Sequence, residues 1–151
     1  MIHENAIIIV AGGSGQRFGG NVPKQFRLLN GLPVLMHTVS LFQAAFSAIK
    51  IILVIPESQQ FLWRDLCEKH QFIVPHSLVY GGDTRFYSVK NGLAEAETSK
   101  FVGVHDAVRP LLSKSLVHTC YETAKRRGSC VPVCGTCSPC TGIIAPGELS
   151  A

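Results

Sequence analysis

The chain has 151 residues, of which 46% are hydrophobic and 16% charged, a composition that fits one globular domain and excludes a wholly disordered protein. Its formal net charge is +4 at pH 7, and the scattered basic residues suit an anionic ligand but form no nucleic-acid-binding surface. No apolar run approaches the roughly 20 residues of a membrane helix and the N-terminus MIHEN lacks a signal peptide, so we expect a cytoplasmic protein.

Short apolar runs rich in β-branched residues alternate with segments of helical periodicity. The runs predict strands at 6–10, 51–55, 77–80 and 101–104, and the periodic segments predict helices at 33–45, 58–70, 84–97 and 113–127. The runs are apolar throughout, as expected for strands that helices cover on both faces. This alternation predicts an α/β fold of three layers with a mostly parallel sheet and right-handed crossovers.

Two of these helices have a predicted apolar face. The expected inward-facing residues are Phe86, Val89, Leu93 and Ala96 in the helix 84–97, and Leu116, Val117, Cys120 and Ala124 in the helix 113–127. The second of these helices ends at Gly128, after three basic residues in its last turn, which is typical of a helix C-terminus.

The loop after the first strand, residues 11–25, contains five glycines and ends near Lys24. Glycines let backbone N–H groups approach an anion closely, while Arg17 and Lys24 would balance the charge of a triphosphate. The loop lacks the Gly-Lys-Ser/Thr ending of a P-loop, and no acidic residue follows at the distance expected in a dinucleotide-binding fold. We therefore predict a nucleoside triphosphate site, the alternative being a glycine-rich surface turn with solvated cations.

Two further loops follow predicted strands, and all three would meet at one edge of the sheet. In the second, Gly81-Gly82-Asp83-Thr84-Arg85, the glycines allow close approach to a base or sugar, and Ser88 would add a hydrogen bond. The alternative is that Asp83 or Thr84 caps the following helix.

The third loop, residues 105–110, begins with His105 and Asp106 and contains Arg109. An acidic residue at a strand tip that faces a phosphate-binding loop is a usual contact for a metal ion or a hydroxyl group. Arg109 would pair with a phosphate or, alternatively, with Asp106 in a local ion pair. We expect a structural role for His105, since this chemistry needs no imidazole.

After the predicted core, residues 1–128, the composition changes. Residues 129–151, here called the tail, are rich in cysteine, proline and glycine and have no helical period. The spacing of Cys130, Cys134, Cys137 and Cys140 is similar to that of iron–sulfur and zinc sites. No second zinc knuckle accompanies it, so we expect an irregular tail without a metal.

Three segments in this order, VAGGSGQRFGGNVPKQF, GGDTRFYSV and VHDAVRP, resemble the 2-C-methyl-D-erythritol 4-phosphate cytidylyltransferases of non-mevalonate isoprenoid biosynthesis. The resemblance covers residues 6–127. It implies a Rossmann-like, glycosyltransferase-A-like nucleotidyltransferase domain. It also implies a reaction that joins CTP and 2-C-methyl-D-erythritol 4-phosphate into 4-diphosphocytidyl-2-C-methyl-D-erythritol and pyrophosphate, with Mg²⁺.

The resemblance also implies residue roles. Arg17 and Lys24 would stabilise the transition state at the CTP phosphates. The expected CTP-binding residues are Ala11, Gly12, Gly13, Gly82, Asp83 and Ser88. Asp106 and Arg109 would face the polyol phosphate, and Asp106 would also bind Mg²⁺.

Members of this family continue past the point that corresponds to residue 151. Their additional part supplies a homodimer arm, a further strand and basic residues that grip the polyol phosphate, and we expect this chain to lack them. Where the family has a Pro-Val-Thr-Asp-Thr-like segment, the chain has PVCGTCSPCTG. The alternatives are a D-ribitol-5-phosphate cytidylyltransferase, or an inactive truncated form that binds CTP.

Overall fold

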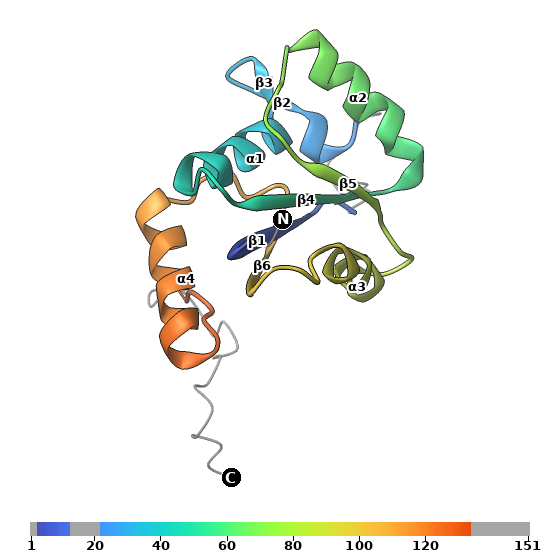
Figure 1. The fold of residues 1–151 in the computed structure, drawn as a ribbon. Helices are drawn as coiled ribbons and strands as arrows, with labels where there is room; N and C mark the ends of the chain where they lie inside the picture. The colour runs from blue at the N-terminus through green and yellow to red at the C-terminus, as the bar shows by residue number, and fades with distance from the viewer. Residues whose placement is uncertain (1–2, 13–21, 134–151) are drawn as a thin grey trace.

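Residues 3–12 and 22–133 are described by a computed structural model (Figure 1). Its main sheet contains β1 (Asn5–Val10), β4 (Lys50–Ile55), β5 (Ser77–Tyr80) and β6 (Phe101–Asp106). The strand order is β5-β4-β1-β6, and every neighbouring pair is parallel. The predicted parallel sheet is confirmed, and β1 lies inside it, between two hydrogen-bonded neighbours.

Helices cover both faces of this sheet (Figure 1). The helices are α1 (Val34–Ala45), α2 (Gln60–Lys69), α3 (Arg85–Glu95) and α4 (Lys114–Arg127). The helices α1, α2 and α4 share the larger apolar core on one face, whereas α3 lies on the other. The predicted three-layer fold is therefore confirmed, and no described helix is long and apolar enough to cross a membrane.

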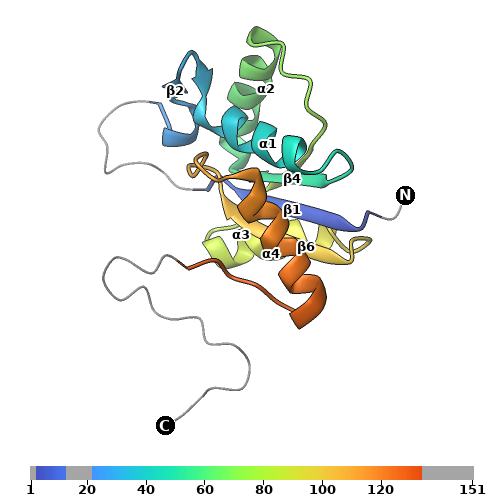
Figure 2. The same ribbon diagram turned by 90° about the vertical axis from the view of Figure 1, so that its left-hand side faces the viewer.

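Short elements connect these layers. The 3-10 turn η2 (Lys24–Phe26) precedes a small antiparallel hairpin of β2 (Leu28–Leu29) and β3 (Leu32–Pro33). A second 3-10 turn, η3 (Glu57–Gln59), leads from β4 into α2. η3 directly follows the end of β4, at the carboxyl edge of the sheet, which is the left-hand edge in Figure 2.

The helix ends follow local signals in the sequence. The Thr84 hydroxyl accepts a hydrogen bond from the backbone N–H of Tyr87 at 3.3 Å and caps α3. Ser113 caps α4 in the same way, through the N–H of Leu116 at 3.1 Å. Gly128 ends α4 with a left-handed φ of 87°, which glycine adopts without a steric cost.

The predicted inward face of α3 is partly wrong. Phe86 is 70% exposed and Leu93 is 45% exposed, whereas Ser88 and Gly92 are buried. The reason is the close approach of the helix to the sheet, since a Cβ added to Gly92 would lie 2.7 Å from Cγ2 of Ile8. Bulky strand side chains fill this layer, so α3 contributes its small residues.

In α4 the inward face includes an aromatic residue that helical periodicity did not select. Tyr121 is buried in the core, while Leu116, from the predicted face, is exposed. The Tyr121 hydroxyl donates a hydrogen bond to the carbonyl oxygen of Ala6 at 2.6 Å. Burial raises the pKa of this phenol well above its usual value, in keeping with a neutral hydrogen-bond donor.

We predict that Tyr121→Phe lowers the free energy of unfolding by about 1 kcal/mol, because the core keeps its ring but loses one buried hydrogen bond. Urea unfolding monitored by circular dichroism measures this change. Tyr87→Phe is the matched control, because Tyr87 is 51% exposed and its loss of a hydroxyl should have little effect. Equal destabilisation by the two variants would contradict the role of the Tyr121 bond.

Candidate functional site

The second and third loops and the two described ends of the first loop lie at the carboxyl edge of the sheet, on the left in Figure 2. Backbone hydrogen bonds extend the strand ladder into each of them. The N–H of Ala11 donates to Val54 at 2.8 Å, that of Gly81 to Ile55 at 2.9 Å, and that of Ala107 to Val10 at 3.0 Å. The predicted convergence is confirmed for the second and third loops and for the ends of the first, while residues 13–21 lie outside the described residues.

The first loop is described only at its two ends. Ala11 is buried and Gly12 is exposed directly after β1, whereas Gly13 and Arg17 lie outside the described residues. Lys24 is half-buried in η2, where the chain returns to the sheet. Lys24 and Gly12 therefore both lie near the carboxyl end of β1, because Gln25, the residue after Lys24, is hydrogen-bonded to Ala11.

Gln25 holds the end of the first loop against the sheet, a role that the sequence did not suggest. Its side chain is 1% exposed, and its Nε2 donates to the carbonyl oxygen of Ala11 at 2.9 Å and to Oε1 of Gln59 at 2.7 Å. Little in the sequence indicates that Gln25 is buried, because a glutamine between a lysine and a phenylalanine fits no helical or strand period.

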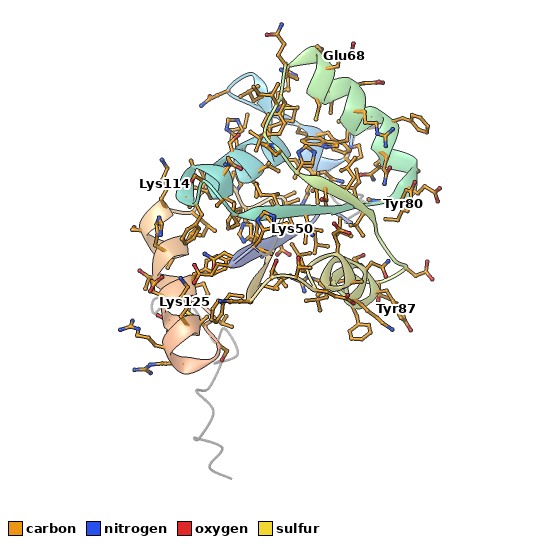
Figure 3. All side chains as sticks on the ribbon, viewed as in Figure 1. Lys50, Glu68, Tyr80, Tyr87, Lys114 and Lys125 are labelled. Carbon is orange, nitrogen blue, oxygen red and sulfur yellow. The ribbon has the colours of Figure 1, made fainter. Side chains whose placement is uncertain are left out.

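Ser88 is hydrogen-bonded to the second loop and lies close to the start of the first. It is buried, its Oγ accepts from the N–H of Gly82 at 3.1 Å, and a Cβ added to Gly12 would lie 3.8 Å from the same oxygen. Gly82 itself must be glycine, because an added Cβ would lie 2.4 Å from Cβ of Tyr87. In Figure 3, Tyr80 and Tyr87 lie on either side of this loop.

Of the two expected caps of α3, Asp83 and Thr84, the structure selects one. Thr84 caps α3, so the alternative reading of Thr84 is confirmed. Asp83 is exposed at the edge of the sheet, where a ligand can reach it.

Asp106 is the last residue of β6, whereas the sequence placed it in a loop. Its Oδ2 accepts from Nε of Arg109 at 3.0 Å, and its Oδ1 accepts from a guanidinium nitrogen of Arg85 at 3.2 Å. The alternative of a local ion pair with Arg109 is therefore present, and Arg85 joins the second loop to the third.

These contacts lower the pKa of the Asp106 carboxyl. Its partial burial acts to raise the pKa, but the hydrogen bonds from Arg109 and Arg85 outweigh burial and hold the pKa below its ordinary value. Because both arginine side chains are largely exposed, such pairs contribute little to stability, and an anionic ligand can compete for the guanidinium groups.

His105 has the contacts of a structural residue, as predicted. Its Nε2 donates to the carbonyl oxygen of Arg109 at 2.9 Å, and its ring lies edge-on to Phe42 with centroids 5.2 Å apart. Burial lowers the pKa of this imidazole, which favours the neutral form.

No group of three or more His, Cys, Asp or Glu side chains is arranged for a metal ion within residues 3–12 and 22–133. Asp106 therefore belongs to no such group in the described part of the chain. Of the four clustered cysteines of the tail, Cys130 is described and is a free thiol, and the others lie outside the described residues.

Residues 5–137 match the sequence profile described as IspD, 2-C-methyl-D-erythritol 4-phosphate cytidylyltransferase. The chain is 48% identical over 142 residues to a protein of that name from Phocaeicola vulgatus, covering 94% of this chain and 65% of the relative. A second relative of that name, from Bacteroides thetaiotaomicron, is 48% identical over 86% of this chain and 59% of its own length. The chain thus spans about three-fifths of these relatives.

Solved structures agree with this likeness. The crystal structure of 4-diphosphocytidyl-2C-methyl-D-erythritol synthase from Anaerococcus prevotii superposes with a TM-score of 0.66 and 28% identity, over 83% of this chain and 52% of that one. The bifunctional IspDF from Campylobacter jejuni has a TM-score of 0.67 and 28% identity, over 82% of this chain and 31% of its own.

We predict that Ser88→Ala makes the backbone amide of Gly82 exchange with solvent about five- to tenfold faster, because a hydrogen bond worth roughly 1 kcal/mol is lost. Amide hydrogen exchange followed by NMR measures this rate. Ser58→Ala, an equivalent change in the exposed turn η3, is the control. An unchanged rate at Gly82 would show that Ser88 does not hold the loop.

Proposed function

Because the chain belongs to the 2-C-methyl-D-erythritol 4-phosphate cytidylyltransferase family, we propose that it transfers a cytidylyl group from CTP to 2-C-methyl-D-erythritol 4-phosphate. The products are 4-diphosphocytidyl-2-C-methyl-D-erythritol and pyrophosphate. The observation that carries this proposal is that the described parts of the three motif segments lie at one sheet edge, where Ser88 lies close to Gly12 and binds Gly82, and Arg85 joins the second and third loops.

The reaction requires mainly the neutralisation of charge. An oxygen of the polyol phosphate attacks the α-phosphorus of CTP, a new P–O bond forms, and the bond to the departing pyrophosphate breaks. The attacking oxygen is already anionic at pH 7, so no general base is needed. Catalysis then consists of alignment and electrostatic stabilisation by fixed cations and backbone N–H groups.

We assign the triphosphate of CTP to the first loop. Lys24 lies at the edge where such a group would arrive, and Arg17 has the same proposed role in the part of the loop outside the described residues. The backbone of Ala11, Gly12 and Gly13 would lie along the nucleotide, since glycines let it approach closely.

The cytidine is assigned to the second loop. Gly82 leaves the backbone bare, because no larger residue fits against Tyr87, and Ser88 fixes its conformation. Asp83, exposed next to Gly82, would contact the nucleoside.

The polyol phosphate is assigned to Asp106 and Arg109. Arg109 is exposed and pairs with a carboxylate, so an incoming phosphate can take over part of its hydrogen bonding. Asp106, whose two carboxylate oxygens each accept a hydrogen bond from an arginine, would also accept hydrogen bonds from the polyol hydroxyl groups.

A divalent cation fits this site through Asp106. Mg²⁺ is usually bound by one or two carboxylates together with substrate phosphates, so a single ionised carboxylate at the sheet edge is an adequate protein contribution. When bound, Mg²⁺ would neutralise phosphate charge. We also propose that the protein acts in the cytoplasm.

We predict that Lys24→Ala and Arg17→Ala each raise the barrier by about 3–4 kcal/mol, a rate loss of roughly 100- to 1,000-fold, because each removes a cation from the transition state. Release of pyrophosphate from CTP, Mg²⁺ and the polyol phosphate measures the rate. Lys69→Ala, which removes an exposed lysine from α2, is the control. Near-normal release by either site variant would refute its assignment.

The choice of polyol has its own test. We expect the chain to release pyrophosphate with 2-C-methyl-D-erythritol 4-phosphate at least tenfold faster than with D-ribitol 5-phosphate, as family membership implies. The reverse preference would identify a ribitol phosphate enzyme. A rise in melting temperature with CTP and Mg²⁺, without turnover of either polyol phosphate, would identify a binding-only form.

A further inference from the structure

Gln25 is one of the few buried polar side chains in the described part of the chain, and it lies next to Lys24. We propose that Gln25 is a positioning residue, which fixes Lys24 at the end of β1 by hydrogen-bonding both ends of the first loop together. This inference rests on the proposed function, because it takes Lys24 as a cation for the CTP phosphates.

The amide of Gln25 joins three segments that are distant in sequence. One N–H of Nε2 donates to Ala11, at the start of the first loop, and the other donates to Gln59, in η3 after β4. Ala11 is itself bonded to Val54 of β4 through its N–H. The start of the loop, its return and the end of β4 are thereby held as one unit.

The backbone around Lys24 is held as well. The N–H of Phe26 donates to Pro23 at 3.0 Å and the N–H of Arg27 donates to Lys24 at 3.2 Å, which closes the turn. Phe26 is buried and stacks on Trp63, with ring centroids 6.2 Å apart. With Gln25 and Phe26 anchored in the core, the backbone of Lys24 has little freedom to move.

Gln25 is the donor in both hydrogen bonds, so a substitution that removes the donor can be compared with one that keeps the acceptor. The Ala11 carbonyl can only accept, so the group at position 25 must donate. Gln25→Glu has the same shape but no N–H, and it places a carboxylate against that carbonyl oxygen. Gln59→Glu, in contrast, keeps an acceptor for Gln25. A role in packing alone would not distinguish the two substitutions.

The experiment measures the NMR signal of the Lys24 side chain as CTP is added. Lysines are labelled by reductive ¹³C-methylation, the Lys24 signal is identified by its loss in Lys24→Arg, and CTP with Mg²⁺ is titrated into the full chain. We expect the Lys24 signal to shift in the wild type and in Gln59→Glu. We expect the concentration needed for the shift to rise at least about tenfold in Gln25→Glu and Gln25→Met, because a buried hydrogen-bond donor is removed.

Turnover gives a second measurement. In both Gln25 variants kcat should fall about 100-fold through misplacement of the cation, with the KM for the polyol phosphate changed less than about threefold. Gln43→Glu in α1 is the matched control, and circular dichroism melting confirms that each variant folds. Gln25→Met keeps the test valid if Gln25→Glu does not fold.

The outcomes separate the two hypotheses. A wild-type Lys24 signal that does not respond to CTP would refute the proposed function, and with it the inference. A normal wild-type response that persists in both Gln25 variants would overturn the positioning role alone. Equal losses in Gln25→Glu and Gln59→Glu would also overturn it, since they would indicate packing.

Discussion

The parallel pairing of β1 with β4 on one side and β6 on the other determines where the candidate ligand-binding residues of the described part of the chain lie. Parallel strands end at the same edge of a sheet, so the loops that follow them are brought together whatever their distance in sequence. β1 is buried along its whole length and cannot shift register without exposing its apolar side chains. The strand ends from which the described loop residues leave are therefore fixed by the core beneath them.

Buried polar side chains hold the described loop residues to this core by hydrogen bonds. Gln25, Ser88 and the hydroxyl of Tyr121 are each buried, and each makes a hydrogen bond to the backbone of β1, of the residue after it or of the second loop. A buried polar group without a partner would be costly, so these contacts select one arrangement of the loops over its alternatives. Their contribution is more to a unique conformation than to total stability.

The third loop differs, because its contacts are exposed. Asp106 holds two arginines at the sheet edge through ion pairs that water screens. Such pairs exchange readily for a phosphate, which is a stronger and more highly charged partner. In the proposed reaction, which brings two anions together, such an exchangeable ion pair would let the second phosphate bind at this edge of the sheet.

The sequence alone was sufficient for the local features. Apolar β-branched runs predicted the four strands of the sheet, and Thr84, Ser113 and Gly128 fit the helix ends because capping involves only neighbouring residues. The glycine and Asp-Arg motifs likewise identified three loops at strand ends.

Only the tertiary structure decided which side chains meet across those loops. Arg85 and Asp106 are 21 residues apart, Gln25 and Gln59 are 34 apart, and Tyr121 and Ala6 are 115 apart. Residue periodicity reports which face of an element is apolar, but not how closely that element approaches its neighbour. For this reason α3 packs through Ser88 and Gly92 instead of Phe86 and Leu93, since the sheet side chains already fill the space between them.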